Sequence, residues 1–167
     1  MIAIVNSSPL IYLGKLGLLD LLQRLFDQVF TVGTVKVEVL DTSESEYATL
    51  QSAFSDWLTV SEVPESPLAG KLNEMGLHQG EVDALVLAYH IKKQKSDSVI
   101  VIDDLAARDV ARTLGLRMTG TIGIILSATK KGILSKKESH AKVRSLVEET
   151  TFHMSAALYS RVLSELE

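Results

Sequence analysis

Acidic side chains occur in three places where they could hold a metal ion together. Asp103 and Asp104 directly follow a continuous apolar run, Glu81 and Asp83 open a long helical pattern, and Glu38 lies in an apolar stretch further upstream. Neighbouring carboxylates repel each other unless they are solvated or offset by a cation. Hard divalent cations such as Mg²⁺ and Mn²⁺ prefer oxygen ligands. The pattern therefore predicts divalent-cation chemistry, provided that the fold brings the three places together.

Each of these acids also has an ordinary explanation. Asp104 could cap the helix that follows it, and Glu81 could be an exposed acid that suits a helix N-terminus. Glu38 could lie on an exposed face. Asp83 is harder to explain in this way, because it shares a helix side with buried positions and a carboxylate beside buried surface needs a partner. Pattern alone leaves these alternatives open.

The first ten residues place an amide side chain next to the same chemistry. The apolar run 2–5 predicts a buried strand, and it ends at Asn6. Ser7 or Ser8 can cap a helix there, with Pro9 near its first position. In an open α/β sheet, ligands bind in the crevice outside the carboxyl ends of the strands. Asn6 is therefore expected to point into the site.

The elements that must position these residues alternate between strands and helices. The run 98–102 has the continuous apolar character of a central parallel strand, and residues 58–63 alternate like an edge strand. Residues 34–40 are ambiguous, and their alternating valines slightly favour a strand. The full set of expected strands is 2–5, 29–32, 58–63, 98–102 and 116–119, and the expected helices are 10–16, 18–26, 44–57, 68–75, 81–95, 105–114, 122–131, 136–149 and 155–166. This alternation predicts a three-layer α/β/α sandwich with a central parallel sheet and a helical C-terminus.

Composition is that of a folded protein of the reducing cytosol. The 167 residues, 46% hydrophobic and 23% charged, fit a single domain over 1–167 with a helical C-terminal extension over about 136–167. There is no cysteine, which excludes thiolate metal sites and a disulfide framework. No signal peptide or membrane span is expected, so we expect a cytoplasmic protein. The net charge of −4 argues against a simple electrostatic nucleic-acid binder, and the basic residues are scattered along the chain.

Four motifs in order resemble the PIN-domain nucleases. Ile4-Val5-Asn6-Ser7-Ser8-Pro9 is similar to the opening of that family, Val37-Glu38-Val39-Leu40 to its second acidic segment, and Gly80-Glu81-Val82-Asp83 to its third. Val101-Ile102-Asp103-Asp104 resembles the strand end that supplies the fourth acid. The resemblance covers essentially the whole chain and is closest to a VapC-like prokaryotic subfamily. It implies a PIN-like fold in which Glu38 lies on a helix.

By this resemblance the protein is a ribonuclease dependent on Mg²⁺ or Mn²⁺ that hydrolyses phosphodiester bonds in single-stranded RNA. Asn6, Glu38, Asp83 and Asp104 would be the catalytic and metal-binding residues, with Asp103 as a further metal ligand and Ser8 and Glu81 in support. Asn6 departs from the usual aspartate, which removes one negative charge beside the ion, and Asp103 could compensate. The resemblance also implies a homodimer and the toxin of a toxin–antitoxin pair, with a small antitoxin protein as partner.

Two other functions fit parts of the sequence. The chain could be a catalytically weakened PIN-fold module that binds RNA or a protein partner, because Asn6 lacks the usual charge. It could also be a phospho-acceptor signalling domain, since an acidic pair at a strand end occurs in response-regulator receivers. Receivers carry that pair after the first strand and a lysine after the last strand, whereas here the pair comes late and Met118-Thr119-Gly120 supplies no lysine. This last reading rests on fold-level analogy alone.

Overall fold

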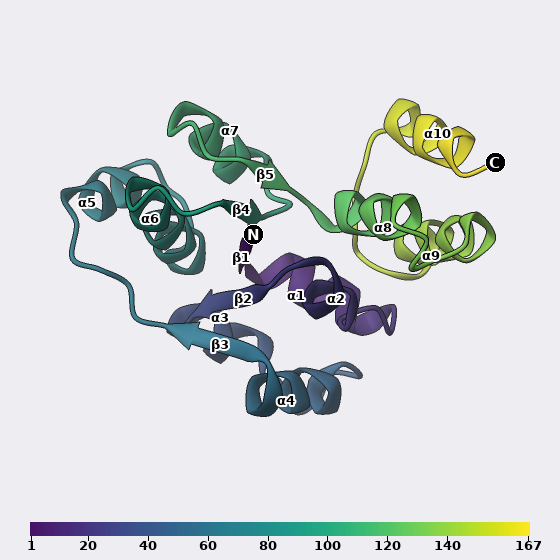
Figure 1. Cartoon of the computed structure of the whole chain (residues 1–167), viewed down its shortest axis with the longest axis horizontal. Helices are drawn as coiled ribbons and strands as arrows, with labels where there is room; N and C mark the ends of the chain where they lie inside the picture. Colours follow the sequence, from purple (N-terminus) through teal and green to yellow (C-terminus); the bar gives the residue numbers. More distant parts are fainter. The chain divides into compact units, whose positions relative to one another are not determined.

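Five parallel strands form one sheet in the computed structural model, which describes residues 1–167. The strands are β1 (Ile2–Val5), β2 (Gln28–Val32), β3 (Leu58–Ser61), β4 (Ser98–Val101) and β5 (Met118–Thr119). Their order across the sheet is β3-β2-β1-β4-β5. The predicted α/β/α architecture is confirmed, because helices flank an all-parallel sheet (Figure 1). Ala3, Ile4 and Val5 of β1 are fully buried, as expected of a strand in the middle of the sheet.

The sheet changes its direction of growth between β1 and β4. From β1 the chain adds β2 and then β3 on one side, and it then crosses over to add β4 and β5 on the other side. Right-handed crossovers therefore place the helices of the two halves on opposite faces of the sheet. The register pairs Val5 with Val101, so the two strands end side by side. This is the topological switch point at which ligands bind in open α/β sheets.

Seven helices accompany the strands. One side of the sheet carries α1 (Ser7–Lys15), α2 (Leu21–Leu25) and α4 (Tyr47–Asp56), and the other carries α5 (Pro67–Glu74), α6 (Gln79–Lys93) and α7 (Leu105–Thr113) (Figure 1). The seventh, α3 (Gly33–Val39), contacts both α1 and α6. Because α6 and α7 run back along the strands, each begins at the edge where the strands end, called the carboxyl edge below. None of the helices is long and apolar enough to cross a membrane.

Residues 33–39 are a helix, so the preference of the valine alternation for a strand was wrong. Val35 and Val39 are buried, and Val37 is 81% exposed. The two buried valines are four residues apart and lie on one helix face, while Val37 between them faces solvent. Glu38 therefore lies on a helix, as the family resemblance implied.

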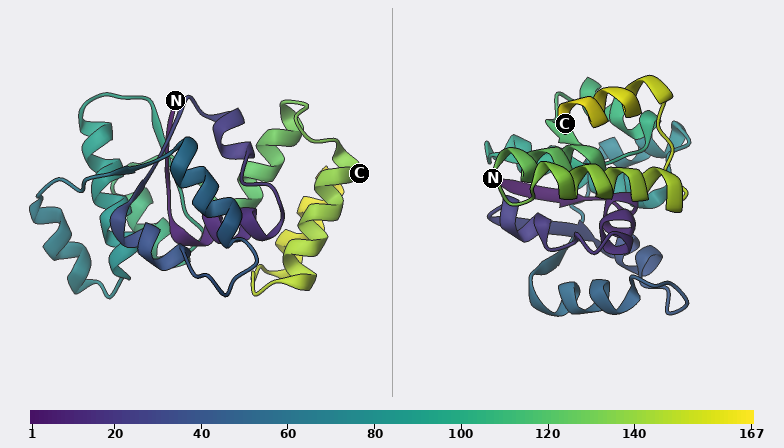
Figure 2. Two further views of the ribbon diagram at one scale, coloured as in Figure 1. Left: turned by 90° about the horizontal axis from the view of Figure 1, so that it is seen from below. Right: turned by 90° about the vertical axis from the view of Figure 1, so that its right-hand side faces the viewer.

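The chain forms two compact units, Met1–Thr121 and Ile122–Glu167. The second contains most of α8 (Thr121–Lys130) together with α9 (Lys136–Glu149) and α10 (Ala156–Glu165), which run beside one another (Figure 2). Ser135 caps α9 by accepting a hydrogen bond from the Glu138 amide. A hydrogen bond of 2.6 Å joins Thr129 of α8 to Ser139 of α9. These helices agree with the predicted ranges; the single-domain organisation stays a prediction.

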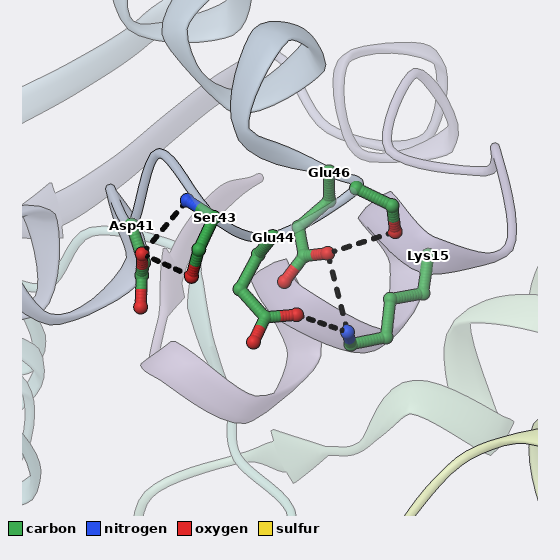
Figure 3. Close-up of polar contacts among 6 residues, drawn as sticks. Lys15, Asp41, Ser43, Glu44 and Glu46 are labelled. Atoms are coloured by element: carbon green, nitrogen blue, oxygen red, sulfur yellow. Dashed lines mark hydrogen bonds and ion pairs between the residues drawn. The ribbon is translucent and has the colours of Figure 1, made fainter.

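An ion pair in which only Glu46 is buried ties the loop after α3 to α1. Lys15 Nζ lies 2.8 Å from Glu44 Oε2 and 3.3 Å from Glu46 Oε2 (Figure 3). Glu46 is only 3% exposed, and its carboxylate contacts Lys15 as its cation and accepts a hydrogen bond of 3.3 Å from Ser45 Oγ. The loop sits so close to α1 that a Cβ on Gly14 would be 2.8 Å from the Cβ of Glu46, which excludes larger residues. The hydrogen bond to Glu44 raises the pKa of Lys15, and Glu46 adds to the shift.

Replacing Lys15 by methionine should leave the buried Glu46 carboxylate without its cation. We expect the free energy of unfolding, measured by urea denaturation at pH 7, to fall by about 1–3 kcal/mol. Lys15→Met/Glu46→Gln should recover most of this loss, because the buried charge is gone. Equal stability of the single variant and the wild type would show that the ion pair contributes nothing.

Candidate active site at the carboxyl edge of the sheet

The site is built where β1 and β4 end. Asn6 follows β1 and is the N-cap residue of α1, and Asp104 follows β4 and is the N-cap residue of α7. The main-chain N–H of Asn6 donates a hydrogen bond of 3.0 Å to the Val101 carbonyl oxygen, which fixes the Asn6 main chain to the neighbouring strand. Because the two strands pair, Asn6 and Asp104 both follow strand ends at the switch point.

Asn6 has a buried acceptor that nothing in the protein satisfies. The residue is 4% exposed, and its Oδ1 has no hydrogen-bond partner. A buried amide oxygen without a donor costs about 1–3 kcal/mol. Such an atom is expected to meet a donor or a cation that is not part of the chain.

Asp104 caps α7 with one oxygen only. Its Oδ1 accepts a hydrogen bond of 2.8 Å from the Ala107 amide. The capping role foreseen as the ordinary explanation is therefore real. It does not exclude a second role, because a carboxylate has about four acceptor positions and this bond uses one of them.

Glu38 is held by a hydroxyl group from α1. Ser7 Oγ donates to Glu38 Oε2 at 2.7 Å. The start of α6 lies against this pair, since a Cβ on Gly80 would come within 3.3 Å of Glu38 Oε2 and 3.7 Å of Ser7 Oγ. Glycine at this position allows the three helices to approach closely. Ser8, predicted to orient a carboxylate, makes no side-chain hydrogen bond; Ser7 is the serine that does.

Both oxygens of the Asp83 carboxylate are held by neutral donors. Thr34 Oγ1 donates to Oδ2 at 2.7 Å and Gln79 Nε2 donates to Oδ1 at 2.7 Å. Thr34 lies one helical turn before Glu38, so α3 presents both residues toward the site. Sequence reasoning missed Thr34 and Gln79. The spacing of four residues between Gln79 and Asp83 in a helix was the available signal for one of them.

Glu81 is a buried carboxylate that interacts electrostatically with two of the other acids. It is 8% exposed, and its Oε2 accepts a hydrogen bond of 3.0 Å from the His78 amide. Burial raises its pKa; the negative charges of Asp104 and Glu38 raise it further, while the hydrogen bond from His78 opposes the shift. Glu81 therefore interacts electrostatically with Asp104 and with Glu38, and the charge of His78 opposes this effect on the pKa of Glu81.

Asp103 faces away from this group. Its oxygens accept bonds from the Thr121 amide at 2.8 Å and the Thr121 hydroxyl at 2.6 Å. Burial raises the pKa of Asp103, while these two bonds and the positive charge of Arg108 lower it. Asp103 thus joins the end of β4 to Thr121 at the start of α8. None of the other site acids affects its pKa.

The side-chain oxygen atoms at this edge are of the type that binds a hard divalent cation. The set combines carboxylates with a buried amide oxygen that lacks a partner, and oxygen atoms are the ligands that such cations prefer. No three acidic or histidine side chains are grouped closely enough to hold an ion by themselves. An ion here would therefore need the Asn6 oxygen, or a small convergence of the carboxylates, to complete its coordination.

Comparison with known proteins agrees with this geometry. A family model described as a PIN domain matches residues 2–167. The chain belongs to the PIN-domain family. Membership indicates nuclease-type activity, and PIN domains generally depend on divalent metal ions. No curated protein and no solved structure matched the chain, and the VapC-like assignment stays a prediction.

The raised pKa of Glu81 predicts how the metal-free PIN domain responds to pH. A folded-state pKa above the unfolded value stabilises the fold below the ordinary glutamate pKa of about 4.3, and this contribution is lost as the pH rises through the raised value. Glu81→Gln removes the titration and keeps an acceptor for the His78 amide. In urea denaturation with EDTA, wild type should lose stability relative to Glu81→Gln as the pH rises from 4.5 to 8. A constant difference, as expected for the exposed control Glu74→Gln, would contradict this.

Proposed function

We propose that this PIN domain is a divalent-metal-dependent endoribonuclease that cleaves single-stranded RNA. The observation that carries the proposal is the unpartnered, buried Oδ1 of Asn6 at the switch point of the sheet. Burial raises the pKa of Glu81, and the charges of Asp104 and Glu38 raise it further, which supports the proposal independently. An orphaned acceptor beside mutually repelling carboxylates is better explained by a cation site than by a purely structural arrangement.

The proposed ligands are Asn6, Glu38, Asp83 and Asp104, directly or through water. Mg²⁺ or Mn²⁺ bound there would offset charge on the scissile phosphate and make a water molecule nucleophilic at neutral pH. The chain's own contribution is to orient the ligands: Ser7 fixes Glu38, and Thr34 and Gln79 fix Asp83. Asp103 is left out of the ligand set because its hydrogen bonds tie it to Thr121 and its charge interacts with Arg108 instead of with the other site acids.

A second candidate function follows from the same residue. Asn6 lacks the charge of an aspartate, and no group of three acids is already assembled. Both features also suit a PIN-fold module that binds RNA or a protein partner without cleaving it. The toxin role, the antitoxin partner and the homodimer rest on the family resemblance alone; co-purification of a small protein with the native chain would test the partner.

Asp104→Asn separates catalysis from helix capping, because asparagine caps a helix as well as aspartate does. We expect kcat/KM for cleavage of a labelled single-stranded RNA in Mn²⁺ to fall by at least about 100-fold, a typical loss for an essential site group. The melting temperature should stay unchanged. Asp109→Asn, an exposed residue of the same helix, is the matched control. Equal cleavage by both variants, or no metal-dependent cleavage by wild type, would favour the binding module.

Asn6→Asp should restore the missing charge and tighten metal binding. A unit charge pair 4 Å apart interacts by about 4 kcal/mol at an effective dielectric constant of 20, and by twice that for a divalent ion. Even after solvation offsets most of this, Mn²⁺ affinity measured by calorimetry should rise by about tenfold or more. Asn73→Asp, on the exposed face of α5, adds the same charge elsewhere and should change nothing. Equal affinities for wild type and Asn6→Asp would refute a direct role of Asn6.

A further inference from the structure

A cavity of about 360 Å³ lies at the opposite edge of the sheet from the acidic site. It is formed where α6 and α7 end and where β4 and β5 begin. Its apolar lining includes Ala88, Ile100 and Leu116, and its polar lining consists of Lys92, Lys95, Ser96, Asp97, Ser98 and Arg117. We call it the basic cavity.

The charge of the basic cavity is opposite to that of the whole chain. Three cationic side chains line it against the single carboxylate of Asp97, whereas the chain as a whole carries a net charge of −4. Lys92 and Lys95 lie close together at the end of α6, and Arg117 comes from a separate segment just before β5. The full group is therefore not one local run of charge. The fold gathers them at one concave place.

Two of these cations are held in place by the protein. Lys92 Nζ donates to the Leu114 carbonyl oxygen at 2.9 Å, and it keeps two further donors. The Arg117 carbonyl oxygen accepts a hydrogen bond of 2.9 Å from the Ile100 amide, which anchors its main chain to the sheet. Its guanidinium pairs with Asp97, and this pair leaves donors unused. The cavity therefore presents oriented, partly free donors.

Helix dipoles explain only part of this arrangement. Lys92 lies in the last turn of α6, where a cation is favourable. Lys95 and Arg117 lie outside the helices. A dipole also gives no reason for a concave surface with two serine side chains in its lining. An anion with several oxygen atoms, such as a phosphate group, accounts for the cations, the hydroxyls and the cavity together.

We propose that the basic cavity binds a backbone phosphate of the single-stranded RNA whose cleavage is proposed above. From Ser98 to Asp104 the chain advances six residues, which at about 3.3 Å per residue places the cavity roughly 20 Å from the acidic site. A stacked strand advances about 3.4 Å per phosphate, so about six nucleotides span this distance. The inference rests on the proposed function for the identity of its ligand, and its test does not require cleavage.

The test measures RNA binding in EDTA, where no cleavage occurs. The variant Lys95→Asn/Arg117→Gln removes two charges; asparagine tolerates the left-handed backbone of residue 95, whose φ is 59°, and glutamine keeps a donor for Asp97. Arg24→Gln/Lys71→Gln removes two exposed charges elsewhere and is the matched control. Fluorescence anisotropy with a labelled 12-nucleotide RNA at 50 mM salt gives the dissociation constant, and circular dichroism checks folding. Lys95→Asn alone is a second variant that leaves the Asp97 pair intact.

We expect the dissociation constant of the cavity variant to rise at least fivefold and that of the control to change less than twofold. The slope of log affinity against log salt should fall by about 0.7, because one lost phosphate contact on a single strand contributes about that much. Unchanged affinity in both cavity variants overturns the inference. Competition by adenosine monophosphate at the same concentration as RNA would also overturn it, by identifying a free nucleotide as the ligand. Absence of cleavage in Mn²⁺ with intact cavity-dependent binding would contradict the proposed function alone.

Discussion

Pairing between β1 and β4 brings together two strand ends that lie far apart in the sequence. The crossover from β3 to β4 reverses the growth of the sheet, so the helices that follow β1 and β4 leave on opposite faces. Asn6 and Asp104, the N-cap residues of these two helices, therefore lie at the same edge of the sheet. The helices α3 and α6 then add Glu38, Glu81 and Asp83 at the same edge. A change that shifted the register of β1 against β4 would separate the site whatever its side chains were.

The site holds its acids with neutral groups instead of cations. Hydroxyl and amide donors from Ser7, Thr34 and Gln79 orient two carboxylates without cancelling their charge, while Glu81 remains subject to repulsion from Asp104 and Glu38. A structural cluster of acids would ordinarily be offset by lysine or arginine. The chain does this elsewhere, where Lys15 compensates the buried Glu46. The acids at the carboxyl edge are thus not paired with lysine or arginine, whereas three cations line the basic cavity at the opposite edge of the sheet.

Sequence patterns predicted the architecture better than the contacts within it. Continuous apolar runs located the central strands β1 and β4, which are buried on both faces, and alternation located the edge strand β3. The alternation of valines failed at residues 33–39, because a helix with two buried valines and an exposed one between them looks the same over so short a segment. The strand ends identified Asn6 and Asp104, but the different orientations of Asp103 and Asp104 depend on Thr121, which no local pattern connects to them. Likewise, the choice of Ser7 over Ser8 and the gathering of Lys92, Lys95 and Arg117 are set by tertiary packing.

The proposed metal site depends on Asn6 Oδ1, the buried oxygen that has no hydrogen-bond partner in the protein. Anomalous diffraction from crystals of the wild-type protein soaked in Mn²⁺ tests it most directly, because it locates the ion independently of activity. We expect a manganese peak at about 2.1 Å from Asn6 Oδ1 or one bridging water away from it, with Asp104 beside the ion. A manganese-soaked crystal without a peak at this edge, or with Asn6 Oδ1 bonded to a protein donor, would contradict it.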